Sequence, residues 1–309
     1  MRTLTGVMMA DSDFDALGLY AEAGRQATRL ALSTARSSLE AGRIPIAGAA
    51  VQRMADGTLK EITRGCNGRI PADGGRGYPT DHGETAAIRC IPNTSAVDWS
   101  EVVFATTLSP CVMCTRTLVH LHKLGLKRIV VAESQSFPGR KDLLRPLSGM
   151  TLVELSSPEA VDMMSQFSRT YPWDWAADIG EIPPADTVDV RPQDVVGAVR
   201  SGAAVVTTDG EVLAHSEDER AAHGGNPVYA PVIRAMGLAG SAVNLREQII
   251  VVQGEGVLDE DSLGLSSMGA LELFRPAALV TPRPVAASVK ETLRAAGTAV
   301  YDCVRTAPV

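Results

Sequence analysis

The sequence lacks a long apolar segment and an excess of positive charge, and both absences narrow what the chain can do. No run of about 18 consecutive apolar residues occurs, so we expect no membrane-spanning helix. Lys and Arg number 29 against 36 Asp and Glu, which gives a net charge of −7. Because proteins that bind nucleic acids usually carry a basic excess, we expect no nucleic-acid partner.

Cysteines are also few, at five in 309 residues, and their number is odd. The first residues, MRTLTGVMMADSD, hold too short an apolar stretch for an export signal, so we expect a cytoplasmic location. An odd number of cysteines without export argues against a disulfide framework. Cys111 and Cys114 form a C-x-x-C pair, and with a histidine in the same half of the chain this spacing favours metal binding.

Helix-like and strand-like segments alternate along the first half, which predicts an α/β/α layered fold. The expected helices lie at 14–41, from 82 onward, at 110–123 and at 158–171, and the expected strands at 46–52, 59–65, 101–106, 127–132 and 151–155. Asp56-Gly57 predicts a hairpin turn between the first two strands. In this order, His82 and Cys111 each stand at the start of a helix. The positive end of the helix dipole at Cys111 favours thiolate over thiol.

The second half repeats this order of elements. Three prolines within 182–194 predict a linker, which we place at 184–194 between a first domain at 1–183 and a second at 195–309. The expected counterparts are a helix at 194–201, strands at 203–208, 212–215, 248–253 and 277–281, and helices ending near 234 and spanning 265–274. Pro227 or Tyr229, Gly264 and Ser267 stand where ligands would be needed. We therefore expect a degenerate second copy without a metal, with an unrelated α/β domain as the alternative.

The motif that carries chemistry is His82-x-Glu84 followed by Pro110-Cys111-x-x-Cys114. One imidazole and two thiolates supply three ligands for Zn²⁺, and a catalytic zinc keeps its fourth position open for water. Glu84 lies close enough in sequence to reach that water and carry its protons. This H-x-E…P-C-x-x-C pattern is the signature of zinc-dependent base and nucleoside deaminases. Two buried apolar cysteines, a structural zinc, or a Glu84 that only favours the helix dipole are the alternatives.

Further segments make residues 14–181 resemble the fungal-type cytosine deaminases of the cytidine deaminase superfamily. The resemblance rests on the motif together with Ile44-Pro45-Ile46, Gly65-Cys66-Asn67, Thr106 to Cys111 and the tail Asp174-Trp175-Ala176-Ala177-Asp178-Ile179-Gly180-Glu181. It implies a three-layer α/β/α fold with a mixed central sheet and a tail that closes the pocket over a free base. The chain departs from the family in its long Gly-rich loop at 68–79, in Asp81, and in the second half.

The resemblance also implies roles for residues around the base. Asn67, the Gly83 backbone N–H, the Ser109 carbonyl and Asp178 would meet the polar edge of the ring, and Ile46, Phe137 and Trp175 would form its apolar walls. From the residues alone, Asn67 could be a turn residue, Phe137 a core residue, Trp175 a packed aromatic and Asp178 a surface acid.

The expected function is hydrolytic deamination of a free nucleobase, with cytosine converted to uracil and ammonia at a zinc held by His82, Cys111 and Cys114. The alternatives are another amino-heterocycle such as guanine, an amino-triazine or a modified pyrimidine, a nucleoside or tRNA substrate, and a deaminase-fold interaction protein. Family members are dimers of single domains, so the second copy is expected to form a pseudo-dimer within one chain that can exist as a monomer.

Overall fold

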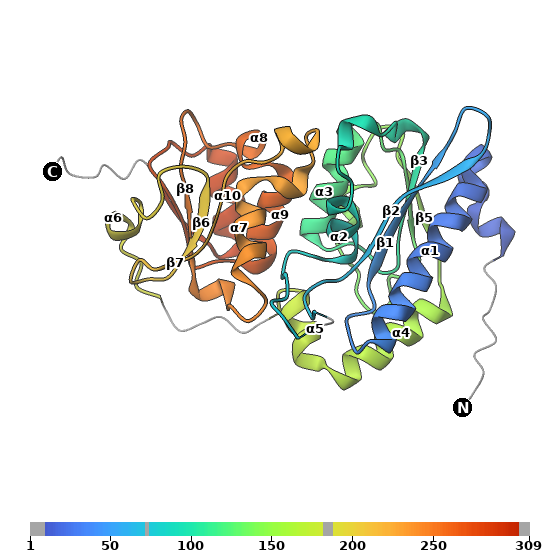
Figure 1. Cartoon of the computed structure of the whole chain (residues 1–309), viewed down its shortest axis with the longest axis horizontal. Helices are drawn as coiled ribbons and strands as arrows, with labels where there is room; N and C mark the ends of the chain where they lie inside the picture. Colours follow the sequence, from blue (N-terminus) through green and yellow to red (C-terminus); the bar gives the residue numbers. More distant parts are fainter. Residues whose placement is uncertain (1–9, 72–73, 182–187, 303–309) are drawn as a thin grey trace.

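The structure is a computed structural model of the chain, and it describes residues 10–71, 74–181 and 188–302. Figure 1 shows two lobes, one for each half of the sequence, with a layer of helices between their two sheets. No helix in these residues is long and apolar enough to cross a membrane. The expected linker at 184–194 is described only from residue 188 onward.

The first lobe contains a five-stranded mixed sheet in the order β2-β1-β3-β4-β5. β1 pairs antiparallel with β2 and β3, whereas β3, β4 and β5 run parallel. The strands span β1 Ala47–Arg53, β2 Leu59–Cys66, β3 Val102–Thr106, β4 Arg128–Val131 and β5 Thr151–Glu154. Each of the five lies within one or two residues of its predicted range, and the mixed sheet of the predicted fold class is confirmed.

Helices cover both faces of this sheet and complete the three layers. On one face, alanines of α1 pack against Ala49, Val51 and Val103. On the other, Ile88, Leu118 and Leu121 of α2 and α3 pack in one cluster with Phe104 and Ile129. The helices are α1 Ala21–Glu40, α2 Gly83–Arg89, α3 Val112–Lys123, α4 Pro158–Thr170 and α5 Pro172–Asp178, with 3₁₀ segments at Asp11–Tyr20, Thr94–Ala96, Trp99–Glu101 and Lys141–Leu143.

The second lobe has the same strand order, β7-β6-β8-β9-β10, and the same pattern of antiparallel and parallel pairs. Both lobes also have a bulge in the hairpin, at Ala50/Val51 and at Val205/Val206. The second copy of the fold is thereby confirmed. The strands are β6 Ala203–Val206, β7 Val212–Ser216, β8 Ile249–Val252, β9 Ala278–Thr281 and β10 Ala299–Asp302.

The helices of the second lobe differ from expectation at its start. Instead of a helix over 194–201, only the four-residue α6 forms, and Gly197, a poor helix former, follows it by two residues. The elements are α6 Pro192–Val195, α7 Pro231–Ala239, α8 Glu260–Leu263, α9 Leu265–Phe274 and α10 Ala287–Ala296, with 3₁₀ segments at Ala221–His223, Pro227–Tyr229 and Leu245–Glu247.

The helix caps correct the expected equivalence of the ligand positions. His82 is the N-cap of α2 and Ala230 is the N-cap of α7. Ala230 and Val232 therefore take the places of His82 and Glu84, and the assignment to Pro227 or Tyr229 was wrong. Gly264 and Ser267 do stand where Cys111 and Cys114 stand in α3.

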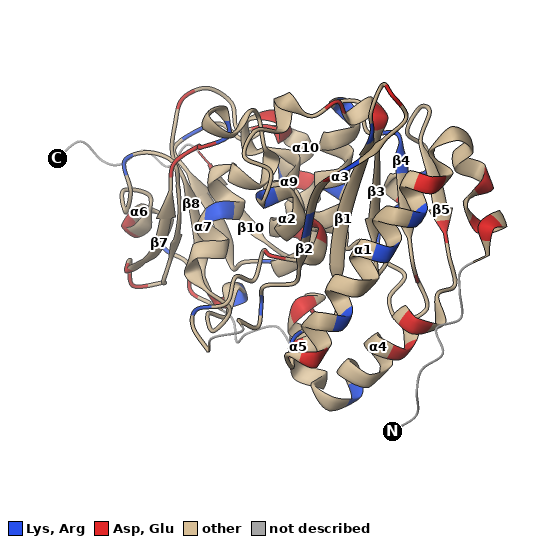
Figure 2. Cartoon of the chain, turned by 45° about the vertical axis from the view of Figure 1, so that its right-hand side comes forward, with Lys and Arg blue, Asp and Glu red and all other residues tan. Residues whose placement is uncertain are grey.

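The two lobes share one apolar core where α3 meets α9. Cys111, Val112, Met113 and Cys114 cluster with residues of the second lobe. A Cβ on Gly269 would lie 2.5 Å from Met113 Cα, so the two helices approach closely because residue 269 is glycine. The buried Asn226 adds polar contacts, since its Nδ2 donates to the carbonyls of Ile88 and Ile91 at 2.9 and 3.2 Å. Figure 2 shows both signs of charge along α1, on the face of the first lobe away from this contact.

Candidate active site

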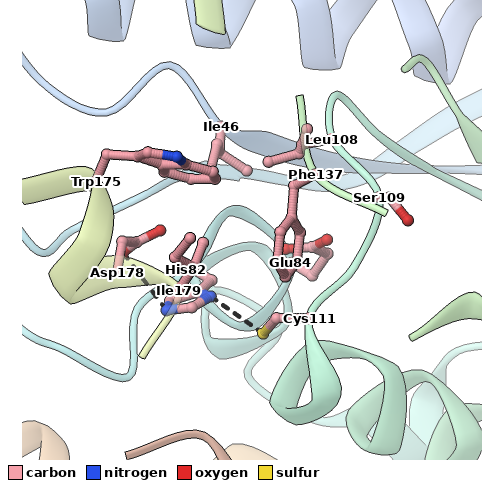
Figure 3. A pocket seen from close by; sticks show the side chains of 10 residues that line it. All are labelled: Ile46, His82, Glu84, Leu108, Ser109, Cys111, Phe137, Trp175, Asp178 and Ile179. Atoms are coloured by element: carbon pink, nitrogen blue, oxygen red, sulfur yellow. Dashed lines mark hydrogen bonds and ion pairs between the residues drawn. The ribbon is translucent and has the colours of Figure 1, made fainter. Parts of the chain in front are cut away.

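Three candidate ligands converge from the first turns of two helices. His82 is the N-cap of α2, Cys111 is the N-cap of α3, and Cys114 is the third residue of α3. Their ligand atoms lie within 4.8 Å of one another, and all three side chains are buried. His82 Nδ1 faces Cys111 Sγ at 3.4 Å (Figure 3). One nitrogen and two sulfurs at this separation fit Zn²⁺, which prefers these donors in tetrahedral geometry.

The opposite side of the His82 ring faces a carboxylate. Nε2 lies 3.5 Å from Asp178 Oδ1 and has no hydrogen-bond partner among the described residues. A carboxylate behind a histidine ligand orients the ring and favours the proton on the outer nitrogen. Asp178 therefore leaves Nδ1 as the nitrogen available to a metal.

The three candidate ligands shift one another's pKa values. Burial opposes the ionised form of Cys111, but hydrogen bonding with Cys114 and the charge of His82 hold its pKa well below the usual value. Burial, together with Cys111, raises the pKa of Cys114 well above the usual value. Burial lowers the pKa of His82, but Asp178 and Cys111 outweigh it and bring this pKa to about 9. Metal ligands bind in their deprotonated forms, so zinc binding here releases protons.

Glu84 is buried beside the ligands and accepts a hydrogen bond from Thr106. Thr106 Oγ1, at the end of β3, donates to Glu84 Oε1 at 2.8 Å. Burial raises the pKa of Glu84 and the bond from Thr106 opposes that rise. A carboxylate with a raised pKa next to a metal site is suited to accept and return a proton near neutral pH.

A small cavity lies directly over these groups (Figure 3). It is lined by the candidate ligands His82 and Cys111 and by Trp175, Asp178 and Ile179 of the tail, and its empty space of about 240 Å³ is partly open to solvent. Phe137 and Trp175 meet edge to face, with ring centroids 6.0 Å apart, and form part of its apolar wall. The lining residues are Ile46, His82, Glu84, Leu108, Ser109, Cys111, Phe137, Trp175, Asp178 and Ile179.

Two residues expected to contact the ring do not line this cavity. Asn67 lies behind Asp178: its Nδ2 donates to both carboxylate oxygens, at 2.9 and 3.0 Å, and its Oδ1 accepts from Arg69 N. Gly83 packs against β1, where an added Cβ would be 2.6 Å from Ala47 Cα. Ser109 lines the cavity, but its hydroxyl turns away and donates to the Pro138 carbonyl at 2.7 Å.

Four residues at the site were not expected from the sequence. Leu108 and Ile179 line the cavity, and both belong to segments that carry the family resemblance, so the sequence held a signal for them. Thr106 reaches Glu84 only because β3 ends beside α2. Phe274 of the second lobe meets the His82 ring edge-on at 6.5 Å, and nothing in the sequence indicated that contact.

Three buried ligands, a neighbouring carboxylate and a small cavity define the class: a catalytic zinc site of a hydrolase. Residues 22–133 match the model of the cytidine and deoxycytidylate deaminase zinc-binding region. A cytosine deaminase of Candida albicans (strain SC5314) is 32% identical over 157 residues, which cover 51% of this chain and 97% of that protein. The chain belongs to the cytidine and deoxycytidylate deaminase family, and it is a zinc-dependent deaminase.

Solved structures of other deaminases are more distant. A guanine deaminase from Nitrosomonas europaea has 17% identity and a TM-score of 0.36, with 55% of this chain and 98% of that chain covered. A structure from a study of A-to-I editing by tRNA deaminases at the wobble position has 19% identity and a TM-score of 0.33, with 45% and 99% covered. Similarity at this level carries no information about the substrate.

Proposed function

We propose that the first lobe deaminates a free nucleobase. Cytosine is the leading substrate, and uracil and ammonia are the products. The observation that carries the proposal is the position of the tail over the metal-binding groups. Trp175, Asp178 and Ile179 line one cavity with His82, Glu84 and Cys111, an arrangement that suits a single planar ring and leaves little room for a ribose. The relative with 32% identity is itself a cytosine deaminase, which supports the same substrate.

The ligands and the acid divide the chemistry between them. His82, Cys111 and Cys114 would hold the zinc, which when bound makes hydroxide available near neutral pH. Glu84 takes one proton from the attacking water and passes it to the ring nitrogen. It then takes the second proton from the hydroxyl group of the adduct and gives it to the leaving amine. Water thus adds to the carbon that carries the amine, the carbon–nitrogen bond breaks, and ammonia leaves. The bond from Thr106 keeps the Glu84 carboxylate aimed into the cavity.

The remaining lining residues orient the ring. Asp178 and the Ser109 carbonyl accept hydrogens from the amine, while Ile46, Phe137 and Trp175 exclude water from its faces. The Gly83 N–H and Asn67 are assigned to the carbonyl edge of the base. For Asn67 this role requires its Nδ2 to share hydrogen bonding between Asp178 and the ring, because both of its bonds now go to Asp178.

Residues 1–183 form the catalytic domain in this proposal, 184–194 the linker, and 195–309 a zinc-free domain of the same fold. A small-molecule substrate, and not a nucleic acid, fits the net charge of −7 and a cavity that the tail residues Trp175 and Asp178 help to line.

The test is ammonia release over a panel of bases with purified protein of measured zinc content. The panel includes cytosine, guanine, an amino-triazine, cytidine and adenosine. Glu84→Ala should retain zinc and lose activity by a factor of at least about 100, the usual contribution of a general acid–base. Equal rates for wild type and Glu84→Ala on every compound would refute catalysis at this site. Turnover of cytidine but not cytosine would refute the free-base proposal.

A further inference from the structure

The second lobe carries none of the four motif residues at the equivalent positions, yet it contacts the tail that lines the ring cavity and the loop that leads from Asn67 to His82. Ala230, Val232, Gly264 and Ser267 stand where the first lobe has its ligands and acid. Any role of this lobe in the reaction is therefore independent of a zinc of its own and depends on what the lobe contacts.

One contacted segment is the tail that closes the cavity. Gly180 directly follows Ile179, a lining residue, and its carbonyl accepts a hydrogen bond from Arg246 Nη2 at 3.1 Å. Gly180 adopts a left-handed backbone (φ 73°), and an added Cβ would be 2.4 Å from the Leu273 carbonyl oxygen at the end of α9. The tail is thus seated closely on the second lobe immediately after Asp178.

The other contacted segment is the loop that follows Asn67. Arg76 donates from Nε and Nη2 to the carbonyl of Ala239, the last residue of α7, at 3.2 and 2.6 Å. Ser241 N donates to the Gly77 carbonyl at 2.9 Å. A guanidinium at the carboxyl end of a helix also interacts favourably with the helix dipole.

The two docked segments meet at one pair of side chains. Asn67 begins the loop and Asp178 ends the helix of the tail, and Asn67 Nδ2 donates to both oxygens of Asp178. Asp178 in turn faces His82 Nε2. A displacement of either segment would therefore move the carboxylate that lies between the ring cavity and the metal ligand.

We propose that the second lobe is a scaffold for the tail and for the loop that supports Asp178 through Asn67, and that Arg246 and Arg76 are the positioning residues that hold these two segments. The proposal rests on the proposed function only where it concerns turnover. It gives the zinc-free copy a role that requires its fold and its surface but no ligands of its own.

Arg246→Ala tests the tail contact, with Arg246→Lys as the conservative variant. Arg283→Ala is the matched control, because Arg283 also donates to two backbone carbonyls of the second lobe, those of Gly256 and Val257. Arg283 follows β9 and Arg246 precedes β8. Because β8 and β9 are parallel, Arg283 lies at the carboxyl ends of these strands and Arg246 at their amino ends. Hydrogen exchange over residues 172–181 is the first readout, and KM and kcat are the second.

Arg246→Ala should increase exchange in residues 172–181 by about 10-fold or more, as expected for the loss of one charge-assisted hydrogen bond. KM should rise by a similar factor with little change in kcat or zinc content, and Arg246→Lys should recover part of both effects. Arg76→Ala should raise KM in the same way, while Arg283→Ala stays at the wild-type values.

Unchanged exchange over 172–181 in Arg246→Ala would overturn the scaffold role, as would an equal effect of Arg283→Ala. If the wild type turns over no base, the proposed function fails, and the exchange measurement alone still decides whether the second lobe holds the tail.

Discussion

Gly83→Ala tests whether the seating of α2 on the sheet sets the geometry of both the metal ligand and the acid. An alanine Cβ at this position would lie 2.6, 2.7 and 2.8 Å from the Cα, N and C atoms of Ala47. Non-bonded carbons normally approach to about 3.5 Å, so the first turn of α2 must move away from β1 by roughly 1 Å. His82 and Glu84 flank residue 83 and must move with it.

The substitution should affect stability only moderately and the rate of deamination strongly. Overpacking against backbone atoms costs about 1–3 kcal/mol of stability, which a folded lobe of this size can tolerate. A displacement of about 1 Å at a catalytic group costs roughly 100-fold in rate. We therefore expect a folded protein with weakened zinc binding and kcat/KM reduced by about two orders of magnitude.

Zinc content by elemental analysis, far-UV circular dichroism and ammonia release measure these effects. Gly197→Ala is the matched control, since its added Cβ would meet no heavy atom within 4 Å. A Gly83→Ala protein with full zinc occupancy and wild-type turnover would refute the reasoning. So would an equal loss in Gly197→Ala.

Two further predictions concern the acid and the assembly. Thr106→Val keeps the side-chain shape but removes the donor to Glu84 Oε1, so kcat/KM should fall about 10- to 100-fold at unchanged zinc content. Thr28→Val removes a buried hydroxyl from α1, which packs on the other face of the sheet from α2 and α3, and should leave kcat/KM unchanged. A Thr106→Val protein as active as the wild type would contradict the assigned role. Because α9 covers the face of α3 on which a partner could dock, light scattering should give a particle near the 32.6 kDa of one chain, and a stable dimer would contradict the pseudo-dimer.

The sequence predicted the strands of both lobes well because burial and turn chemistry are local signals. Runs of β-branched and small apolar residues separated by Asp-Gly turns gave β1, β2, β6 and β7 to within a residue or two. The sequence reading missed α5 within the tail, the four-residue α8, and α10 with β10 at the end. In α10, Val289 and Leu293 stand four residues apart and are both buried, so the sequence held a signal for that helix.

In the site, as in the fold, the features that depend on local sequence were predicted and those that depend on distant contacts were not. Motif spacing indicated His82, Cys111 and Cys114, because two helix starts carry all three ligands. The partners of those groups could not be predicted, since they join residues far apart in the chain: Asn67 with Asp178, Thr106 with Glu84 and Phe274 with His82. The equivalence of α7 with α2 was also misplaced, because apolar patterns align to within a turn whereas an N-cap is visible only in the backbone.

The correspondence between the lobes shows how a metal-binding fold can persist without its ligands. In the first lobe, the N-termini of α2 and α3 meet at the histidine and the two cysteines. In the second, Ser267 stands in the place of Cys114, and its hydroxyl accepts a hydrogen bond from Ile233 N in the first turn of α7 at 3.3 Å. The helix starts that converge on a metal site in one lobe are thus joined by a direct hydrogen bond in the other. That bond stabilises by only about 1 kcal/mol, so most of the second lobe's stability must come from its apolar core and from the α3–α9 contact. Selection on the second lobe would then act on its surface toward the first lobe, where Arg246, Leu273 and Phe274 reach the tail and the histidine ligand.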